Sequence, residues 1–303
     1  FETKDLGEPN DLLGMKVERD EKKGTLKLSC PRVLTDLLKS TGTTDAFPAC
    51  SPATVPHRDD LVPAKDEYVS AKFEPLAIVG SMQFAATMCR VDLACICSML
   101  GSERHAPTLS GFKNVKRSLK YTSGTVDVGL VYHAPAEGVF PSLQITDYVD
   151  TDFVGDLKLA VDPTGKSRFG KLSFLDGDLV DWQSKLLSTV STSSAAAEVS
   201  GLSASCKRLI WLRRLLTEAG FTQKPTVVYE DNTAAIKTAN TDAMADRMRH
   251  LHVSELFVRE LRRDREINIK YIKSVDNLAD FLTKIQPVAV FRSMRDRIMG
   301  NKH

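Results

Sequence analysis

Residues 142–153 read SLQITDYVDTDF, and this stretch decides how the second half of the chain is interpreted. Apolar and polar residues alternate through it, which is typical of a strand with one buried face. The segment 168–185, RFGKLSFLDGDLVDWQSK, alternates in the same way around Asp176-Gly177, a dipeptide that favours a two-residue hairpin turn. Residues 142–185 are therefore predicted to begin a β-sheet.

The chain beyond this hairpin alternates between helix and strand patterns. A long helix is expected from about residue 194 to 219, where a Gly-Phe pair ends it. Strand patterns follow in TVVYEDN (226–232) and INIKYIKS (267–274), with helices expected from residue 233, at about 248–263, within 276–284 and near 288–298. This order predicts an α/β fold with a mixed five-stranded sheet and helices on both faces, over residues 138–303.

The first 137 residues have a different pattern. LLGMKVERDEKKGTLKLSC (12–30) predicts an N-terminal hairpin, and a short helix follows it. A long, extended, proline-rich connection leads from residue 44 to 72, and mostly apolar helices are expected at about 73–88, 91–101 and 107–122. Residues 1–137 are therefore predicted to be a smaller, mostly helical region with an N-terminal hairpin.

Composition narrows the class of protein. At 42% hydrophobic residues the 303-residue chain has enough apolar side chains for real cores, and its net charge of +2 does not by itself indicate nucleic acid. The six cysteines form no CxxC pair and no zinc spacing, which favours reduced, mostly buried thiols in an intracellular protein. The longest apolar runs are shorter than the roughly 20 residues of a membrane span, so no membrane partner is expected.

Four basic residues recur on one face of the helix expected at 107–122. They are Lys113, Lys116, Arg117 and Lys120, at positions i, i+3, i+4 and i+7. One interpretation is a solvated face on a helix that packs against the core. The other is a row of contacts to the phosphate backbone of a nucleic acid, and the pattern alone leaves both open.

Three acids lie where this layout makes them converge. Asp150 is in the first strand of the second half, Asp231 closes the strand TVVYED, and Asp280 lies in NLADFLTK. The ends of neighbouring strands in an α/β sheet meet at one edge, where ligands bind. Acids gathered there need cations, and a pair of magnesium ions is the usual arrangement for hydrolysing phosphodiesters. The alternative is a structural role, in which each acid is only a turn or helix-cap residue.

The motifs YVDTDFVGD, VSTSSAAAEVSGLSA, WLRRLL, YEDNTAAI, RHLHVSELFVRE and NLADFLTK resemble, in order and spacing, the ribonuclease H domain of copia-type retrotransposon polyproteins. The N-terminal motifs, including LAIVGSMQFAATMCRVDLA and FKNVKRSLKYTSGTVDVGLVY, resemble the thumb- or connection-like segment between the polymerase palm and ribonuclease H. The resemblance covers almost the whole chain. It implies hydrolysis of the RNA strand of RNA–DNA hybrids with two magnesium ions, manganese being an alternative.

The resemblance assigns Asp150, Asp231 and Asp280 as catalytic metal ligands. The remaining ligand is expected at the first glutamate of a Thr-Glu-Ala-Glu-Tyr-like stretch, a position that Ala196 occupies in our register. Glu198 then matches the second glutamate, and two residues along a helix turn it about 200° away from position 196. We therefore expect a vacant ligand position at Ala196, Glu198 as a weak substitute, and impaired activity.

The resemblance also implies partners and a place in the cell. The Tyr-x-Asp-Asp motif of the family's polymerase is not in this sequence, so the polymerase palm of the same polyprotein is expected as a partner beside the nucleic acid. The location implied is intracellular, in cytoplasmic virus-like particles or the nucleus. Three functions stay open: a ribonuclease H, a catalytically silent nucleic-acid-binding module, and a decayed structural remnant.

Overall fold

A computed structural model describes residues 7–62, 74–104, 107–135, 141–153, 164–241 and 252–300. The chain divides into two compact units. The first comprises residues 1–138 together with 287–303, and the second comprises residues 139–286. The boundary expected between residues 137 and 138 is one residue from this division, in a stretch outside the described residues.

The first unit contains an antiparallel four-stranded sheet in the order β1-β2-β3-β4. Its strands are β1 (Asp11–Leu12), β2 (Met15–Asp20), β3 (Thr25–Ser29) and β4 (Gly129–His133). β2 and β3 form the predicted hairpin. β4 pairs with β3, with Leu28 opposite Leu130. The sequence pattern did not identify β4, because its pairing partner lies far away in the chain.

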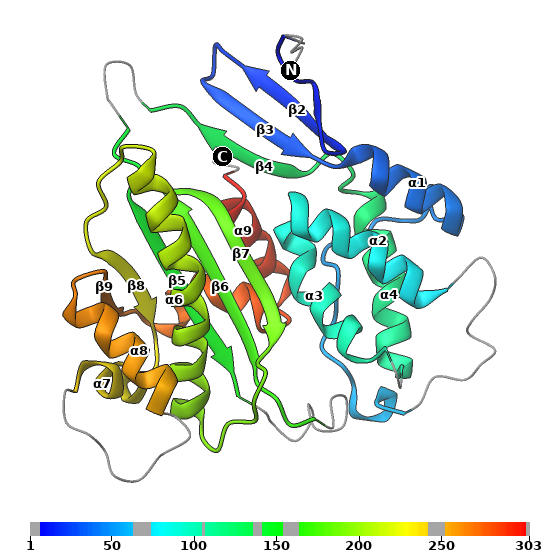
Figure 1. Cartoon of the computed structure of the whole chain (residues 1–303). Coiled ribbons are helices and arrows are strands. Elements are labelled where there is room, and N and C mark those ends of the chain that lie inside the picture. Colours follow the sequence, from blue (N-terminus) through cyan, green and yellow to red (C-terminus); the bar gives the residue numbers. More distant parts are fainter. Residues whose placement is uncertain are drawn as a thin grey trace, which may run out of the picture. The chain divides into compact units, whose positions relative to one another are not determined.

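Helices α1 (Pro31–Thr41), α2 (Pro75–Met88), α3 (Val91–Ser102) and α4 (Leu109–Ser123) make up the rest of this unit's N-terminal part, with the short helix η1 at Arg58–Asp60 (Figure 1). The proline-rich connection is fixed against α4. The Asn114 amide bonds both the N–H and the carbonyl of Thr54, and the Ser118 hydroxyl donates to the carbonyl of Pro52. This part of the connection therefore follows α4.

The last helix, α9 (Val288–Ile298), also belongs to the first unit, whereas the sequence placed it in the second. Phe291 packs edge-on against Tyr121 of α4, with ring centroids 5.7 Å apart. Arg295 donates to the Tyr121 hydroxyl at 3.3 Å, and the backbone N–H of Val131 donates to the Met299 carbonyl. The correction has a physical reason: Phe291 and Arg295 of α9 contact Tyr121 of α4, which lies in the first unit.

The second unit is built on the predicted mixed five-stranded sheet, in the order β7-β6-β5-β8-β9 (Figure 1). Its strands are β5 (Ile145–Asp152), β6 (Arg168–Leu175), β7 (Asp178–Leu186), β8 (Thr226–Glu230) and β9 (Ile267–Tyr271). β5, β6 and β7 are antiparallel, while β8 runs parallel to both β5 and β9. The sheet confirms the α/β class expected from the sequence.

Helices α6 (Ser194–Glu218), α7 (Thr233–Asn240) and α8 (His252–Arg263) share one core with a face of this sheet. Val149, Phe169 and Val228 from the strands contact Leu202 and Leu209 of α6 in that core. The short helices η3 (Ser274–Asp276) and η4 (Leu278–Leu282) follow β9, and η4 packs on β5 and β6. Within the described residues, no helix is both long and apolar enough to cross a lipid bilayer.

All six cysteines are free thiols, and five of them are buried while Cys50 is exposed. The sulfur atoms of Cys30 and Cys89 lie 3.0 Å apart in the first unit. This pattern agrees with the mostly buried, reduced thiols that the spacing of the cysteines predicts.

Candidate functional site

The parallel pairing of β5 and β8 brings Asp150 beside Asp231. Tyr148 lies opposite Tyr229, and two further residues along this register place the two aspartates at the same edge. The carboxyl ends of parallel strands meet there, which is the usual position of a ligand site in an α/β sheet. Asp150 is only 2% exposed, so its carboxylate is held inside the fold.

Helix η4 carries Asp280 to the same edge. The Asn277 side chain anchors it, donating to the Val149 carbonyl at 2.9 Å and accepting from the Ala279 N–H. Gly170, which pairs with Asp150 across the sheet, permits the close approach. A Cβ there would lie 2.8 Å from a side-chain carbon of Thr283, inside the normal contact limit.

Asp150, Asp231 and Asp280 consequently form one cluster. One carboxylate oxygen from each lies within 4.8 Å of the others. This spacing meets the geometric requirement for a shared cation, as the sequence predicted. Their role as metal ligands stays a prediction.

One cation of the chain already lies against this cluster. The Lys284 ammonium is 2.7 Å from an Asp280 oxygen and 3.5 Å from an Asp150 oxygen. Thr283 donates its hydroxyl hydrogen to the other Asp150 oxygen. Sequence reasoning gave neither residue a role, although both belong to the NLADFLTK motif.

The prediction that Glu198 points away from the acids is wrong. Its carboxylate lies within 4.8 Å of those of Glu230 and Asp231, in a second cluster that shares Asp231 with the first. Ala196 has another role: it is buried in the first turn of α6, and its backbone N–H is capped by the Ser193 hydroxyl. Because positions 196 and 198 are about 200° apart on a helix, Ala196 faces away from the carboxylates.

The sheet-facing stripe of α6 explains the orientation of Glu198. Glu198, Leu202, Ser205 and Leu209 recur every three or four residues, Leu216 follows two turns later, and all are buried. This periodicity was readable from the sequence, and it places Glu198 on the same face as the leucines. Our register relied on motif spacing instead and therefore assigned the wrong residue.

A glycine lets α6 approach the sheet beside Glu198. A Cβ on Gly201 would lie 2.1 Å from the Thr151 hydroxyl oxygen on β5 and 3.3 Å from the Phe169 ring. No side chain fits at that position. The close contact fixes α6 one helical turn beyond Glu198, next to the strand that carries Asp150.

Glu230, the last residue of β8, is a further carboxylate that sequence reasoning missed. It is 0% exposed and lies on the same strand face as Thr226 and Val228, which are also buried. The period of two along β8 was the available signal, because it turns Glu230 towards the helix layer. Glu230 received no role from the sequence, because the family resemblance assigns the ligand at this strand end to Asp231.

Burial and mutual repulsion change the acidity of these groups. Burial raises the pKa of Asp150 to about 6, with Asp280 and Asp231 adding to the rise and Lys284 opposing it. Burial is also the main cause of a Glu230 pKa of about 8. The pKa of Glu198 rises to about 10, through burial and then the neighbouring charges of Glu230, Asp150 and Asp231. The site therefore favours protons or another cation at neutral pH.

The donor set suits a hard divalent cation. All the converging groups are carboxylates, and magnesium and manganese prefer such oxygen ligands. One oxygen of Glu198 and one of Glu230 are buried without a hydrogen-bond partner. An oxygen in that state is available to coordinate an ion.

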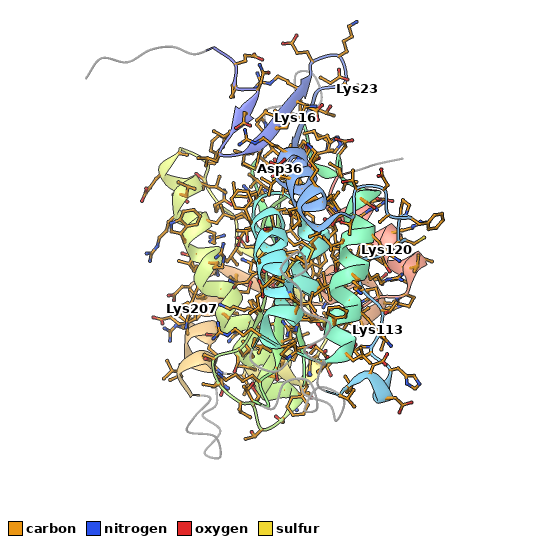
Figure 2. The ribbon with its side chains drawn as sticks, turned by 90° about the vertical axis from the view of Figure 1, so that its right-hand side faces the viewer. Lys16, Lys23, Asp36, Lys113, Lys120 and Lys207 are labelled. Carbon is orange, nitrogen blue, oxygen red and sulfur yellow. The ribbon has the colours of Figure 1, made fainter. Side chains whose placement is uncertain are left out.

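The predicted basic face lies along α4, where Lys113, Lys116 and Lys120 are exposed (Lys113 and Lys120 in Figure 2). The Lys113 ammonium is 2.8 Å from both carboxylate oxygens of Asp60. Lys113 is therefore already paired with an acid of the proline-rich connection. The use of this face by nucleic acid stays a prediction.

Two of the other three basic residues of this face contact groups of their own unit. The Lys116 ammonium lies over the Phe112 ring, 4.5 Å from its centroid. Arg117 is half-buried and donates to the Ser51 hydroxyl at 3.1 Å. Arg117 thus helps to fix the connection to α4, which the solvated-face interpretation did not foresee.

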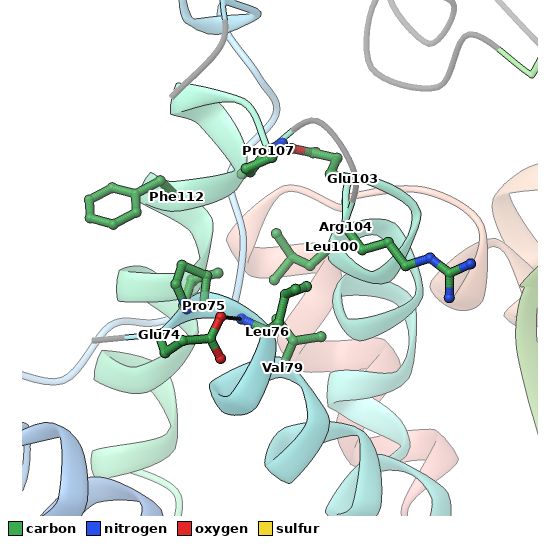
Figure 3. Close-up of a pocket in the computed structure, with 11 residues that line it drawn as sticks. Glu74, Pro75, Leu76, Val79, Leu100, Glu103, Arg104, Pro107 and Phe112 are labelled. Carbon is green, nitrogen blue, oxygen red and sulfur yellow. Dashed lines mark hydrogen bonds between the residues drawn. The ribbon is translucent and has the colours of Figure 1, made fainter. Parts of the chain in front are cut away.

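A cavity of about 120 Å³ lies among the ends of α2, α3 and α4 (Figure 3). Its lining is mainly apolar, with Leu76 and Val79 among the contributors. Its two carboxylates have local roles, since Glu74 caps α2 and Glu103 accepts from the backbone and hydroxyl of Thr108. Because both of these carboxylates are already engaged, the acidic edge of the second unit remains the candidate site.

Comparison with known proteins identifies relatives across nearly the whole chain. The retrovirus-related Pol polyprotein from transposon TNT 1-94 of Nicotiana tabacum is 30% identical, over 98% of this chain and 22% of the polyprotein. The corresponding polyprotein from transposon RE2 of Arabidopsis thaliana is 29% identical, over 98% of this chain and 20% of its own length. The chain thus spans about a fifth of the length of these two relatives.

No family model matches the chain. Among solved structures, the N-terminal RNase H domain of Rv2228c from Mycobacterium tuberculosis matches 50% of this chain and 96% of its own, at 13% identity and a TM-score of 0.35. The assignment follows from the sequence relatives, whose similarity extends through both units. The relatives of this chain across nearly its whole length are therefore copia-type retrotransposon Pol polyproteins, as the sequence motifs predicted.

Proposed function

We propose that the second unit of this segment hydrolyses the RNA strand of RNA–DNA hybrids. Asp150, Glu198, Asp231 and Asp280 form its catalytic group, and two magnesium ions are the cofactors, with manganese as an alternative. Residues 1–137 act as a thumb- or connection-like region that contacts the hybrid.

The convergence of these four carboxylates is the observation that carries the proposal. They come from β5, α6, the turn after β8, and η4, and they gather at one sheet edge. Burying like charges together is unfavourable unless something neutralises them. Lys284 contacts Asp150 and Asp280, and a single ammonium carries too little charge to neutralise four carboxylates, so the arrangement is suited to bound cations.

The chain's own residues supply binding and orientation. Asp231 belongs to both clusters and is suited to hold two ions side by side. Asp150 and Asp280 complete one position, and Glu198 contributes to the other. When bound, the two ions supply an activated water and stabilise the leaving oxygen of the phosphodiester. Thr283 and Asn277 hold Asp150 and η4 in place through their hydrogen bonds.

The substrate and partners follow from the same assignment. An RNA–DNA hybrid presents phosphates to the basic residues of α4, of which Lys116 and Lys120 are exposed on the first unit. The polymerase palm of the same polyprotein is the expected protein partner. The expected compartment is the cytoplasmic virus-like particle or the nucleus.

Cleavage of a labelled hybrid tests the proposal. The chain should cut the RNA strand with magnesium and lose this activity in chelator. Asp150→Asn should lower the rate by on the order of 10²-fold or more, because it removes a charge at the reacting phosphate. Asp276→Asn is the matched control, since this exposed aspartate lies close in sequence to Asp280 and outside both clusters. Equal rates for the Asp150 variant and the control would contradict the assignment.

The alternative of a catalytically silent remnant rested on a vacant ligand position at Ala196. Glu198 lies in the acidic cluster, so that reason no longer applies. Hybrid binding in chelator without cleavage in magnesium would still select the silent module. Absence of both binding and cleavage would select a structural remnant.

A further inference from the structure

Glu230 is a buried carboxylate that the proposed catalytic group does not use. Its side chain is fully enclosed at the end of β8. One oxygen accepts the Asn232 backbone N–H at 3.0 Å, while the other has no hydrogen-bond partner. A buried strand position of this kind is normally apolar, and an unpaired carboxylate there lowers the stability of the fold.

Glu198 on α6 faces Glu230 and is likewise a buried carboxylate. It is 6% exposed, and one of its oxygens is also buried without a partner. Carboxylate oxygens of Glu198, Glu230 and Asp231 lie within 4.8 Å of one another. Two buried carboxylates that each have an unpartnered oxygen thus belong to one cluster with Asp231.

The two clusters differ in their compensation by cations. Lys284 contacts Asp150 and Asp280 in the first cluster. For Glu198 and Glu230, the described part of the chain contains no ion pair with any lysine or arginine. The missing positive charge must therefore come from a proton or from a bound ion.

We propose that Glu230 is an additional ligand of this protein, which forms with Glu198 and Asp231 a site for a hard divalent cation such as magnesium or manganese. This site corresponds to the second of the two ion positions, and in that respect the inference rests on the proposed function. Asp231 connects the two positions. A spacing of about 4 Å between two ions allows one carboxylate to bridge them.

Titration of the full chain with Mn²⁺ in a calorimeter, without hybrid, tests the proposal. The wild-type protein should bind two ions. Glu230→Gln keeps the side-chain shape and the acceptor for Asn232, and it should weaken one of the two bindings by roughly tenfold or more, the usual size of such an effect at a metal site. Glu198→Gln should weaken the same binding, whereas Asp280→Asn should weaken the other.

Glu255→Gln is the matched control for a buried glutamate of the same unit. Its carboxylate is paired with Arg259 on α8, so its replacement removes a compensated charge. This variant should melt at a lower temperature and keep both Mn²⁺ affinities. Glu230→Gln should melt no lower than wild type in chelator, because it removes an uncompensated charge.

The outcomes separate this inference from the proposed function. Unchanged Mn²⁺ binding by Glu230→Gln overturns the inference, even if the wild-type chain cleaves hybrids. A Glu230→Gln variant that melts below wild type in chelator also overturns it, since Glu230 would then stabilise the fold directly. Loss of one Mn²⁺ site in Glu230→Gln, in a chain that does not cleave hybrids, supports the inference and rejects the proposed function.

Discussion

The two units differ in whether their buried charged side chains have partners of opposite charge. In the first, the fully enclosed Arg90 donates to both oxygens of Asp92 at 2.8 Å, and the Tyr121 hydroxyl donates to the same carboxylate at 2.6 Å. Burial alone raises the pKa of Asp92, but Arg90 and Tyr121 outweigh it and hold that pKa below its usual value. In the second, Glu198 and Glu230 face each other with raised pKa values.

The same contrast recurs within one strand. Asp147 of β5 accepts from the hydroxyls of Ser173 and Ser205, and the Lys171 ammonium is 3.7 Å away. Three residues later, Asp150 lies among other acids. A buried charge that has partners of its own therefore supports the fold, whereas a buried charge without them is suited to bind a ligand. Burial alone does not separate the two classes.

Arg90→Met should produce the largest loss of stability. Removing one partner leaves Asp92 buried and uncompensated, which costs about 3–5 kcal/mol of unfolding free energy. Urea unfolding followed by circular dichroism measures the loss, and hydrogen exchange in α3 and α4 locates it. Arg19→Met is the control, because its exposed pair with Glu8 is worth at most about 1 kcal/mol. Equal losses of unfolding free energy in both variants would contradict the contrast in buried charge between the two units.

In the metal-free protein, the acidic site should make the stability of the fold decrease as pH rises. Raised pKa values in the folded state mean that folding takes up protons, so this contribution is fully present below the unfolded pKa values of about 4. It is lost as pH rises through about 6 for Asp150 and about 8 for Glu230. In chelator, stability should therefore fall by up to about 5 kcal/mol between pH 5 and pH 9, at about 1.4 kcal/mol for each unit of pKa shift within that range.

Magnesium should flatten this profile, since a bound cation replaces the protons. The measurement is the melting temperature of the protein across the pH range, with and without magnesium. Glu198→Gln in chelator should also reduce the slope, because it removes one of the raised groups. Identical slopes with and without magnesium would show that the cluster does not take up the ion.

Gly201→Ala tests how the site is held together. The new Cβ would meet the Thr151 hydroxyl at 2.1 Å, so α6 must move away from β5 and carry Glu198 with it. Overpacking of this kind typically costs about 1–3 kcal/mol, and Mn²⁺ binding should weaken as well. Adding Thr151→Ala removes the obstacle and should restore part of both losses.

Gly80→Ala is the control for that experiment. Gly80 lies within α2, and a Cβ there would meet no atom within 4 Å. Alanine is the better helix former, so the control should stabilise the chain by up to about 1 kcal/mol. A Gly201→Ala variant as stable as this control would contradict the close approach of α6 to β5.

The sequence predicted those features that depend on local periodicity. Alternation identified the five strands of the second unit, and the rule for parallel strand ends brought Asp150 and Asp231 together. Periodicity also contained the correct orientation of Glu198, which lies on the leucine stripe of α6. That error came from trusting the spacing of a motif above the face of a helix.

Other features depend on contacts between distant segments, and local patterns do not contain them. β4 pairs with β3 from the other end of the first unit, and α9 is held there by its contacts with Tyr121. The contact of Lys284 with Asp150 on β5, and the lack of a cation partner at Glu230 within the described residues, also appear only when the elements are assembled. Periodicity indicates the buried faces of Glu198 and Glu230 separately, but their approach to each other depends on how α6 packs on the sheet.

The smallest expected effects concern the exposed charges of α4, where the ion pair of Lys113 gives a prediction with a definite sign. Lys120→Glu should weaken binding of an RNA–DNA hybrid severalfold at low salt, and it should reduce the slope of log affinity against log salt by about one for each phosphate that the helix no longer binds. Lys113→Glu should do less, because Asp60 already neutralises that ammonium. Asp60→Asn should strengthen binding, since it frees Lys113 for a phosphate. Fluorescence anisotropy in chelator, across a salt series, measures all three without cleavage. Unchanged binding by Asp60→Asn together with an unchanged salt slope for Lys120→Glu would make this face a solvated surface, unlike the buried charges that distinguish the two units.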